Sequence, residues 1–358
     1  MITDYSEILQ KLEKINPIKY TKDRNFVDGS VTRLSPYISR GVISTKFVYR
    51  YLIKKGYTLN KILKFVQELV WREYWQISWC NYDINKDLKN TQDDVLQYGI
   101  PSIINEHATK INAIDNSIIE LYETGYMHNH LRMYVASLIT NIAKYHWQIP
   151  AKWMYYHLLD ADWGSNALSW QWVCGANSNK KYYANQQNIN KFTKTHQSNT
   201  ILDCSYEKLS NLNQPKDYTE IANINLTTTF PKCEKLKIDY NKPICIYNFY
   251  NLDCNWRNDL NANRILLLEP SIFKNYPISE KSMKFMLDLA KNIDDIKVFV
   301  GEFHEIPTKN SKVYFKEHPL NKNYKGIEDQ REWLCRPEKP FRSFFKHWNF
   351  VLKEIASI

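Results

Sequence analysis

Apolar residues recur at helical spacing through the first half of the chain. Near the start, Tyr5, Ile8 and Leu12 share one helix face, and Pro17 is expected to end that helix. Ser44 is a suitable N-cap for another helix. The same spacing predicts helices at 4–15, 44–55, 60–80, 113–124, 126–146, 151–160 and 164–173, with loops or short turns at 20–43 and an irregular stretch at 81–108.

The pattern changes after residue 195. Residues 196–242 are rich in Asn, Thr, Lys and Ser without a sustained period, which is typical of a linker or an irregular wrap. No strand is expected before residue 240. Short apolar runs then predict strands at 244–250, 263–270 and 296–303, and helical spacing returns at 279–292 and 341–355.

These patterns predict a two-domain chain. Its 358 residues leave room for two hydrophobic cores. We expect an all-α domain at 1–195, the linker at 196–242, and a smaller α/β domain at 243–358. Apolar strands alternating with a helix favour a parallel sheet covered by helices, a Rossmann-like unit without a GxGxxG loop.

Residues 126–172 carry polar side chains where a buried helix would show an apolar stripe. Asn129, Arg132 and Met133 fall at helical spacing on one face, and Asn166 and Trp170 are again four apart. Two carboxylates, at positions 160 and 162, lie between these groups. Amides, a guanidinium, carboxylates and indoles in one stretch suit a polar, planar aromatic ligand.

Charge and cysteine usage narrow the function class. The formal charge is +10, with more of the basic excess in residues 1–200, so the helical half is the better candidate for binding a polyanion. The seven cysteines form no CxxC pair, which argues against a disulfide framework or a metal site and favours a reducing compartment. With no leader and no apolar run of membrane-spanning length, we expect a cytoplasmic protein.

Four ordered blocks carry a resemblance to a known family. They are VTRLSPYISRG (31–41), ELVWREYW (68–75), MHNHLRM (127–133) and DADWGSNALSWQW (160–172). Together they resemble the flavin-binding helical domain of the DNA photolyase/cryptochrome family, over residues 17–195. The resemblance implies an all-α FAD-binding domain. Relatives usually carry an α/β antenna domain before it, so the α/β domain here is either a permuted counterpart, which similar strand order and size favour, or an unrelated appendage.

The resemblance implies a cofactor site built from several blocks. Flavin phosphates would be held by the first block, and its alternative role is a Ser/Pro turn that caps the next helix. Other residues would contact the isoalloxazine, with Asn166 facing N5 and Asp160 paired with Arg132. The implied FAD-binding residues are Tyr20, Thr32, Arg33, Leu34, Ser35, Glu68, Arg72, Asn129, Arg132, Asp160, Asp162 and Asn166.

A lesion pocket and an electron relay follow from the same resemblance. In the family, a Glu hydrogen-bonds the damaged pyrimidine pair and a Trp stacks on it, which suits a flipped base. The implied pocket residues are Glu68, Trp71, Asn129, Met133 and Trp172. Trp170 and Trp147 match the inner relay positions, and no Trp stands at the third position, where Tyr98 or Trp79 can substitute.

Three functions compete at this point. The first is light-driven repair of cyclobutane pyrimidine dimers by a FAD-dependent deoxyribodipyrimidine photo-lyase, whose partner is DNA with UV lesions. The second is a cryptochrome-like blue-light photoreceptor that keeps FAD, repairs nothing and signals to a protein partner. The third, a nucleic-acid-binding module without flavin, requires the pattern of Asp160, Asp162 and Asn166 to be accidental.

Overall fold

The computed structural model describes residues 1–232 and 235–356, which fold into two compact units. The first unit comprises residues 1–18, 32–81 and 227–358, and the second comprises residues 19–31 and 82–226. Packing therefore groups residues 1–18 and 32–81 with the C-terminal sheet. The domain boundaries expected after residues 195 and 242 stay a sequence-based prediction.

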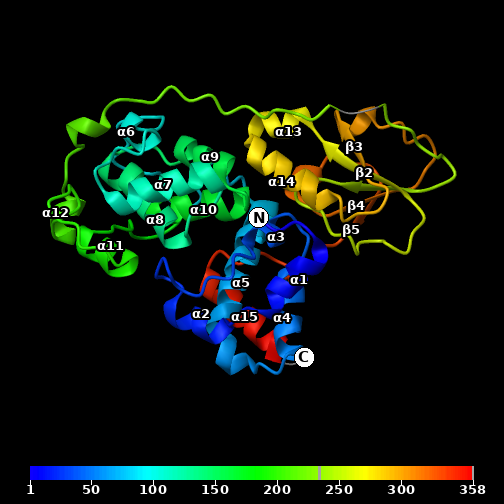
Figure 1. Ribbon diagram of the computed structural model, residues 1–358, viewed down its shortest axis with the longest axis horizontal. Coiled ribbons are helices and arrows are strands. Elements are labelled where there is room, and N and C mark those ends of the chain that lie inside the picture. The colour runs from blue at the N-terminus through cyan, green and yellow to red at the C-terminus, as the bar shows by residue number, and fades with distance from the viewer. Residues whose placement is uncertain (233–234, 357–358) are drawn as a thin grey trace. The chain divides into compact units, whose positions relative to one another are not determined.

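Capping side chains define the starts of α1 and α4 in the first unit. The Asp4 carboxylate accepts the Glu7 N–H at 3.1 Å before α1 (Tyr5–Glu13). The Ser44 hydroxyl accepts the Phe47 N–H at 2.9 Å, which confirms the predicted start of α4 (Thr45–Lys54). The further helices of this unit are α3 (Ser35–Ser39), α5 (Leu59–Asn81), α13 (Pro270–Asn275), α14 (Glu280–Ala290) and α15 (Phe344–Ala356) (Figure 1).

The first unit also contains a five-stranded sheet in the order β3-β2-β1-β4-β5, with every pairing parallel. The parallel sheet was predicted, and β1 to β3 occupy the three predicted runs. The order reverses direction between β1 and β4, as in one half of a doubly wound fold. The strands are β1 (Ile244–Tyr247), β2 (Asn263–Leu268), β3 (Lys297–Val300), β4 (Val313–Lys316) and β5 (Ile327–Asp329).

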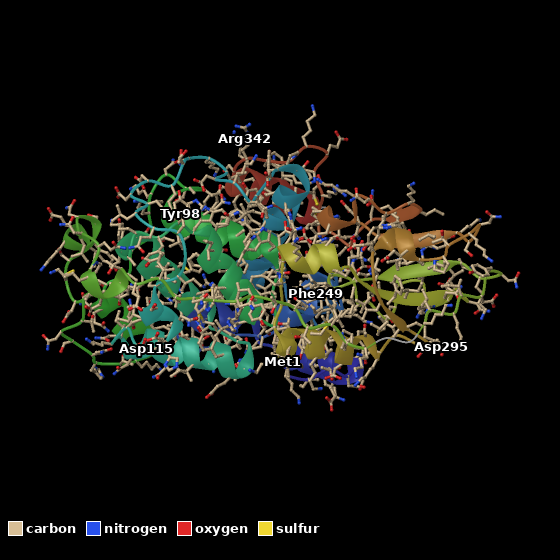
Figure 2. The ribbon with its side chains drawn as sticks, turned by 90° about the horizontal axis from the view of Figure 1, so that it is seen from above. Met1, Tyr98, Asp115, Phe249, Asp295 and Arg342 are labelled. Atoms are coloured by element: carbon tan, nitrogen blue, oxygen red, sulfur yellow. The ribbon has the colours of Figure 1, made fainter. Side chains whose placement is uncertain are left out.

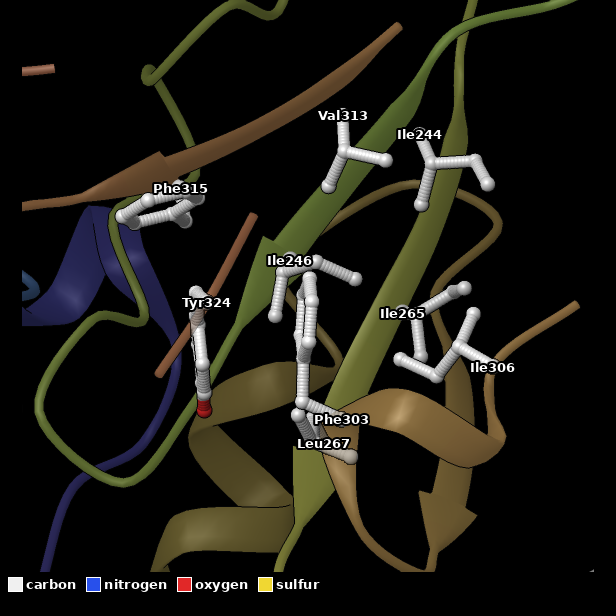
Figure 3. Packing of buried hydrophobic residues seen from close by; sticks show 9 residues of the cluster. All are labelled: Ile244, Ile246, Ile265, Leu267, Phe303, Ile306, Val313, Phe315 and Tyr324. Atoms are coloured by element: carbon white, nitrogen blue, oxygen red, sulfur yellow. The ribbon is translucent and has the colours of Figure 1, made fainter. Parts of the chain in front are cut away.

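One face of this sheet is closed by a cluster of apolar side chains (Figure 3). Each contributes on the order of 1.5–3 kcal/mol by leaving water. The Tyr324 ring lies at 11° to the Phe303 ring, with centroids 4.4 Å apart, and its hydroxyl donates to Glu269 at 2.6 Å. The cluster consists of Ile244, Ile246, Ile265, Leu267, Phe303, Ile306, Val313, Phe315 and Tyr324.

Helix α15 packs on α5 through its apolar face. Trp348, Val351 and Ile355 are buried there. Beside them, the buried Glu73 accepts hydrogen bonds from the Thr45 hydroxyl and from the Leu334 N–H, so a carboxyl group ties the segment before α15 to α5. Burial raises the pKa of Glu73 to about 7, above the value that these hydrogen bonds alone would set.

The second unit is helical. Its helices are α2 (Pro17–Asp23, which begins in the first unit), α6 (Ser102–Asn105), α7 (Asn112–Thr124), α8 (Asn129–Ser137), η1 (Leu138–Ile142), α9 (Gln148–His157), α10 (Trp163–Cys174), α11 (Gln186–Thr193), α12 (Tyr206–Ser210) and η2 (Lys216–Tyr218) (Figure 1). As expected, no strand precedes β1 among the described residues.

Three local predictions were wrong. Pro17 starts α2 instead of ending a helix, because proline fits the first turn, where its missing N–H is not needed. Helices α2 and α3 occupy part of the expected loop at 20–43. The continuous helix at 126–146 is interrupted by the π-turn η1, where the Thr140 hydroxyl donates to the Ala136 carbonyl at 2.8 Å and competes with the regular backbone ladder.

The helices and the cysteines of the described residues can be compared with what the composition led us to expect. Within residues 1–232 and 235–356, no helix combines the length and apolar character that crossing a bilayer requires. The six cysteines in this part of the chain are all free thiols.

The α5–α15 contact gives a pH-dependent prediction through His347. This imidazole is fully buried, neither ring nitrogen has a hydrogen-bond partner among the described residues, and burial lowers its pKa to about 4. Below pH 6.5 the unfolded chain binds a proton that the folded chain excludes, so stability falls as pH drops toward 4. Relative to His347→Phe, the wild type should lose about 2 kcal/mol of unfolding free energy between pH 7 and pH 5.

Urea titrations of both proteins across this pH range measure the difference directly. Glu73 contributes a dependence of opposite sign between pH 4.5 and 7, but it is present in both proteins and cancels. A pH-independent difference between the two proteins would contradict the prediction.

Candidate flavin site

The predicted phosphate-binding residues lie at the start of α3 in the first unit. The Thr32 hydroxyl accepts the Leu34 N–H at 3.3 Å, so it helps to shape the turn. Arg33 is exposed and adopts a positive φ of 52°, a left-handed conformation that is uncommon outside glycine. Ser35 begins the helix, and Pro36 provides no N–H. For a phosphate group, this turn therefore provides mainly side-chain hydroxyls and the Arg33 guanidinium. It does not provide a row of backbone N–H donors.

Glu68, Trp71 and Arg72 lie on one face of α5, as their spacing predicts. Glu68 pairs with Lys64 at 3.0 Å, and its side chain is 31% exposed. Trp71 is stacked on Phe344 at the start of α15, with ring centroids 3.3 Å apart and planes at 7°. Its ring also meets Trp75 at 5.0 Å and 35°. The contact with Phe344 had no signal in the sequence, because the two residues are far apart along the chain.

In the second unit, the half-buried side chain of Arg132 and the buried carboxylate of Asp160 form an ion pair. One guanidinium nitrogen of Arg132 donates to both carboxylate oxygens of Asp160, at 3.0 and 3.1 Å. Nε of the same side chain donates to the Met127 carbonyl at 2.8 Å. Asp160 is only 7% exposed, so the Arg132 guanidinium partly offsets the cost of burying its charge. The pair joins α8 to the turn that precedes α10.

Asp162 and Asn166 occupy the first turns of α10. The Asp162 carboxylate caps this helix and accepts the Ser165 N–H at 3.2 Å. The Asn166 amide donates to the Ala151 carbonyl at 2.7 Å, which fixes its orientation against α9. Asn129 is exposed and Met133 half-buried on α8, and Tyr20 is half-buried on α2.

The tryptophans of this unit differ in how far their side chains are exposed to solvent. Trp147, Trp163 and Trp170 are at most 2% exposed, whereas Trp172 is 36% exposed. The Trp147 N–H donates to Asp87 at 2.7 Å, and the Trp163 N–H donates to Asn85 at 3.0 Å. The Trp147 and Trp163 ring centroids are 6.3 Å apart. Asp87 and Asn85 were missed by the sequence analysis, because both lie in the stretch expected to be irregular.

These groups fit a flavin. An isoalloxazine ring presents carbonyl oxygens and ring nitrogens that accept hydrogen bonds, together with one imide N–H that donates. Arg132 and Asn166 carry N–H donors, and Asp160 and Asp162 carry acceptors, all on α8, α10 or the turn between α9 and α10. The second unit thus holds the donor and acceptor set that the polar edge of such a ring requires.

Comparison with known proteins decides the family. Residues 65–248, just over half of the chain, match the family described as the FAD binding domain of DNA photolyase. The chain belongs to this photolyase family. FAD is therefore its cofactor, and the third function, a nucleic-acid-binding module without flavin, is excluded.

Individual photolyases and cryptochromes are similar to part of the chain. The photolyase domain is 30% identical over 168 residues to a deoxyribodipyrimidine photo-lyase of Agrobacterium fabrum, which covers 44% of this chain and 34% of that protein. It is 31% identical over 185 residues to cryptochrome DASH of Xenopus laevis, and this match covers 48% of this chain and 35% of that protein. The matched region thus spans about a third of each of these curated relatives.

A solved structure is also similar. The crystal structure of a bacterial class III photolyase from Agrobacterium tumefaciens aligns with a TM-score of 0.42 and 21% identity, over 60% of this chain and 51% of that one.

The ion pair between Arg132 and Asp160 gives a prediction. Asp160→Asn leaves the half-buried guanidinium of Arg132 without its counter-charge, which should cost about 1–3 kcal/mol of stability. FAD affinity should fall about tenfold or more, the change that about 1.4 kcal/mol of lost positioning brings. Flavin fluorescence titration of the apoprotein measures the affinity, and circular dichroism reports whether the variant is folded.

The matched control is Asp28→Asn. Asp28 pairs with Lys194 in the same unit, but both side chains are more than half exposed, so its loss should change neither quantity noticeably. A folded Asp160→Asn protein that binds FAD as tightly as wild type would remove Asp160 from the site.

Proposed function

We propose that this protein is a FAD-dependent enzyme that uses blue light to repair cyclobutane pyrimidine dimers in DNA. Bound, reduced and excited FAD supplies the electron that splits the cyclobutane ring and receives it back. The protein binds the extruded dimer, orients it and excludes water. Family membership supports the cofactor, and the Agrobacterium fabrum relative carries the name of this activity.

The exposure of Trp172 carries the repair proposal. Helix α10 buries Trp163 and Trp170 but leaves Trp172 36% exposed, although all three have the same large apolar surface. Exposed Asn129 and half-buried Met133, on the neighbouring helix α8, belong to the same proposed pocket. An accessible indole with an amide and a thioether from an adjacent helix suits an extruded pair of linked pyrimidines, which presents apolar ring faces together with carbonyl and N–H groups.

DNA binding would rest on the basic surface. The chain carries 48 Lys and Arg against 38 Asp and Glu, enough for phosphate contacts that carry no sequence information. Discrimination of the lesion then depends on stacking and hydrogen bonding in the pocket. Binding of undamaged DNA should weaken steeply with salt, and the extra affinity for the dimer should depend less on salt.

The blue-light photoreceptor is the second candidate, and the contact between Trp71 and Phe344 favours it. A lesion platform needs a free ring face, but one face of Trp71 is covered by Phe344 and Trp75 packs closely as well. In a photoreceptor this stack needs no opening, and α15 can pass a signal to a protein partner. Repair requires the Phe344 ring to move away when the dimer binds.

The repair proposal is tested with chemically reduced, FAD-loaded protein and an oligonucleotide that contains one thymine dimer. Wild type should bind it more tightly than the undamaged strand and restore the thymines under blue light. Trp172→Ala should weaken dimer binding by about 1–3 kcal/mol. Tyr206→Ala removes another exposed aromatic ring of the same unit, 48% accessible, and should have no effect. If wild type neither prefers nor repairs the dimer, the photoreceptor replaces the enzyme.

Phe344→Leu distinguishes the two candidates at Trp71. Leucine keeps most of the buried volume but cannot stack, so the variant should fold. If Trp71 receives the dimer, removing its competitor should tighten dimer binding about two- to tenfold, the equivalent of the 0.5–1.5 kcal/mol of an aromatic pair. Affinity for undamaged DNA is the internal control. Unchanged dimer affinity would assign Trp71 to the α5–α15 core.

A further inference from the structure

The first turn of α15 presents an aromatic ring to solvent. Phe344 is buried on Trp71, but the next residue, Phe345, is 65% exposed. Among residues 338–356, all of which the structure describes, Phe345 is the one large apolar side chain that is exposed. Leaving a phenyl ring in water forgoes the free energy that its burial would provide.

Unpaired cations surround this ring. Arg342, labelled in Figure 2, and Lys346 are exposed, and neither side chain forms an ion pair or hydrogen bond with the described residues. Lys339 is a third exposed cation, against one exposed carboxylate in the same segment, Glu338. The first turn of α15 contains no acidic residue that would neutralise the positive end of the helix. A single exposed apolar side chain is common on protein surfaces, but its combination with these cations indicates a binding surface.

Contacts with α5 hold this turn in place. The Tyr74 hydroxyl donates to the Arg342 carbonyl at 2.9 Å, and Phe344 is stacked on Trp71. The ring centroids of Phe344 and Phe345 are 5.5 Å apart. The exposed ring and its neighbouring cations therefore project from a fixed helix turn, which lowers the conformational entropy that binding must remove.

A phenyl ring between a guanidinium and an ammonium group matches the chemistry of an unpaired nucleotide. Every nucleobase has an apolar face that can stack on an aromatic ring, and the phosphates on either side are anions. A base in an intact duplex is stacked on both faces, so an unpaired base is the one that leaves a face free. An anionic membrane would instead need a stripe of apolar side chains, but the next outward positions on α15, Asn349 and Lys353, are polar.

We propose that Phe345 stacks on an unpaired nucleobase of bound DNA and that Arg342 and Lys346 contact the phosphates beside it. The inference rests on the proposed repair function and deepens it, because extruding a dimer leaves unpaired bases in the duplex. Phe345 is the neighbour of Phe344, which covers Trp71, so the DNA contact lies beside the ring that would receive the dimer. Because Phe345 is already exposed, this contact forms without any movement of Phe344.

The test compares two labelled single strands that share the same phosphates, an oligothymidylate and an abasic oligonucleotide of equal length. FAD-loaded, full-length protein is titrated in the dark, and fluorescence anisotropy reports binding. Phe345→Ala should weaken binding of the oligothymidylate about 5- to 150-fold, the equivalent of about 1–3 kcal/mol of base stacking, and leave binding of the abasic strand unchanged. Phe345→Trp should retain or increase the wild-type affinity.

Two kinds of control separate charge from stacking. Arg342→Gln and Lys346→Gln should each weaken binding of both strands and reduce the slope of log K against log salt concentration by about 0.7. Tyr240→Ala removes another exposed ring of the first unit, whose centroid lies 3.8 Å from Nζ of Lys309, and should change neither affinity.

The outcomes separate this inference from the repair proposal, because neither strand contains a dimer. If Phe345→Ala weakens binding of both strands equally, or of neither, the stacking assignment is overturned. Wild type that binds phosphatidylserine vesicles more tightly than DNA, and loses this binding in Phe345→Ala, would assign the ring to a membrane surface instead. Failure to repair a dimer oligonucleotide overturns the repair proposal and leaves the result at Phe345 standing.

Discussion

The arrangement of the helical unit depends on the ion pair of Arg132 with the buried carboxylate of Asp160. One guanidinium holds the Asp160 carboxylate and the Met127 carbonyl, so the start of α8 and the turn before α10 are fixed to one group. Asp162, two residues later, caps α10 and sets the direction in which Asn166 and the tryptophans follow. Burying charged groups costs free energy. The proposed flavin site accounts for this cost, because the same side chains would also hydrogen-bond the isoalloxazine ring.

Much of the fold follows from local rules that the sequence expresses directly. The Ser44 cap and the apolar faces of α1, α5 and α14 are set by residues within a few turns of one another. Strands β4 and β5 were missed because each is short: β4 buries only Val313 and Phe315, and β5 is mostly exposed and has two acidic residues among its three. Their pairing depends on the crossover that places β4 beside β1, a contact between distant segments.

The same division applies to the candidate site. Sequence spacing placed Glu68, Trp71 and Arg72 on one helix face, and the resemblance paired Arg132 with Asp160, as the structure does. The contact of Phe344 with Trp71 and that of Asp87 with Trp147 join segments whose separation along the chain carries no periodic signal.

Energetics limit how Trp71 can become accessible. Exchanging Phe344 for a base trades an aromatic pair of about 0.5–1.5 kcal/mol for a base stack of about 1–3 kcal/mol, so the net change lies between about 0.5 kcal/mol unfavourable and about 2.5 kcal/mol favourable. Releasing the whole helix α15 would also expose Trp348, Val351 and Ile355, at roughly 1.5–3 kcal/mol each. No single stacked base can offset that cost. If Trp71 receives the dimer, a local rotation of Phe344 at the first turn of α15 is therefore the route that these energies favour, with the rest of the helix in place.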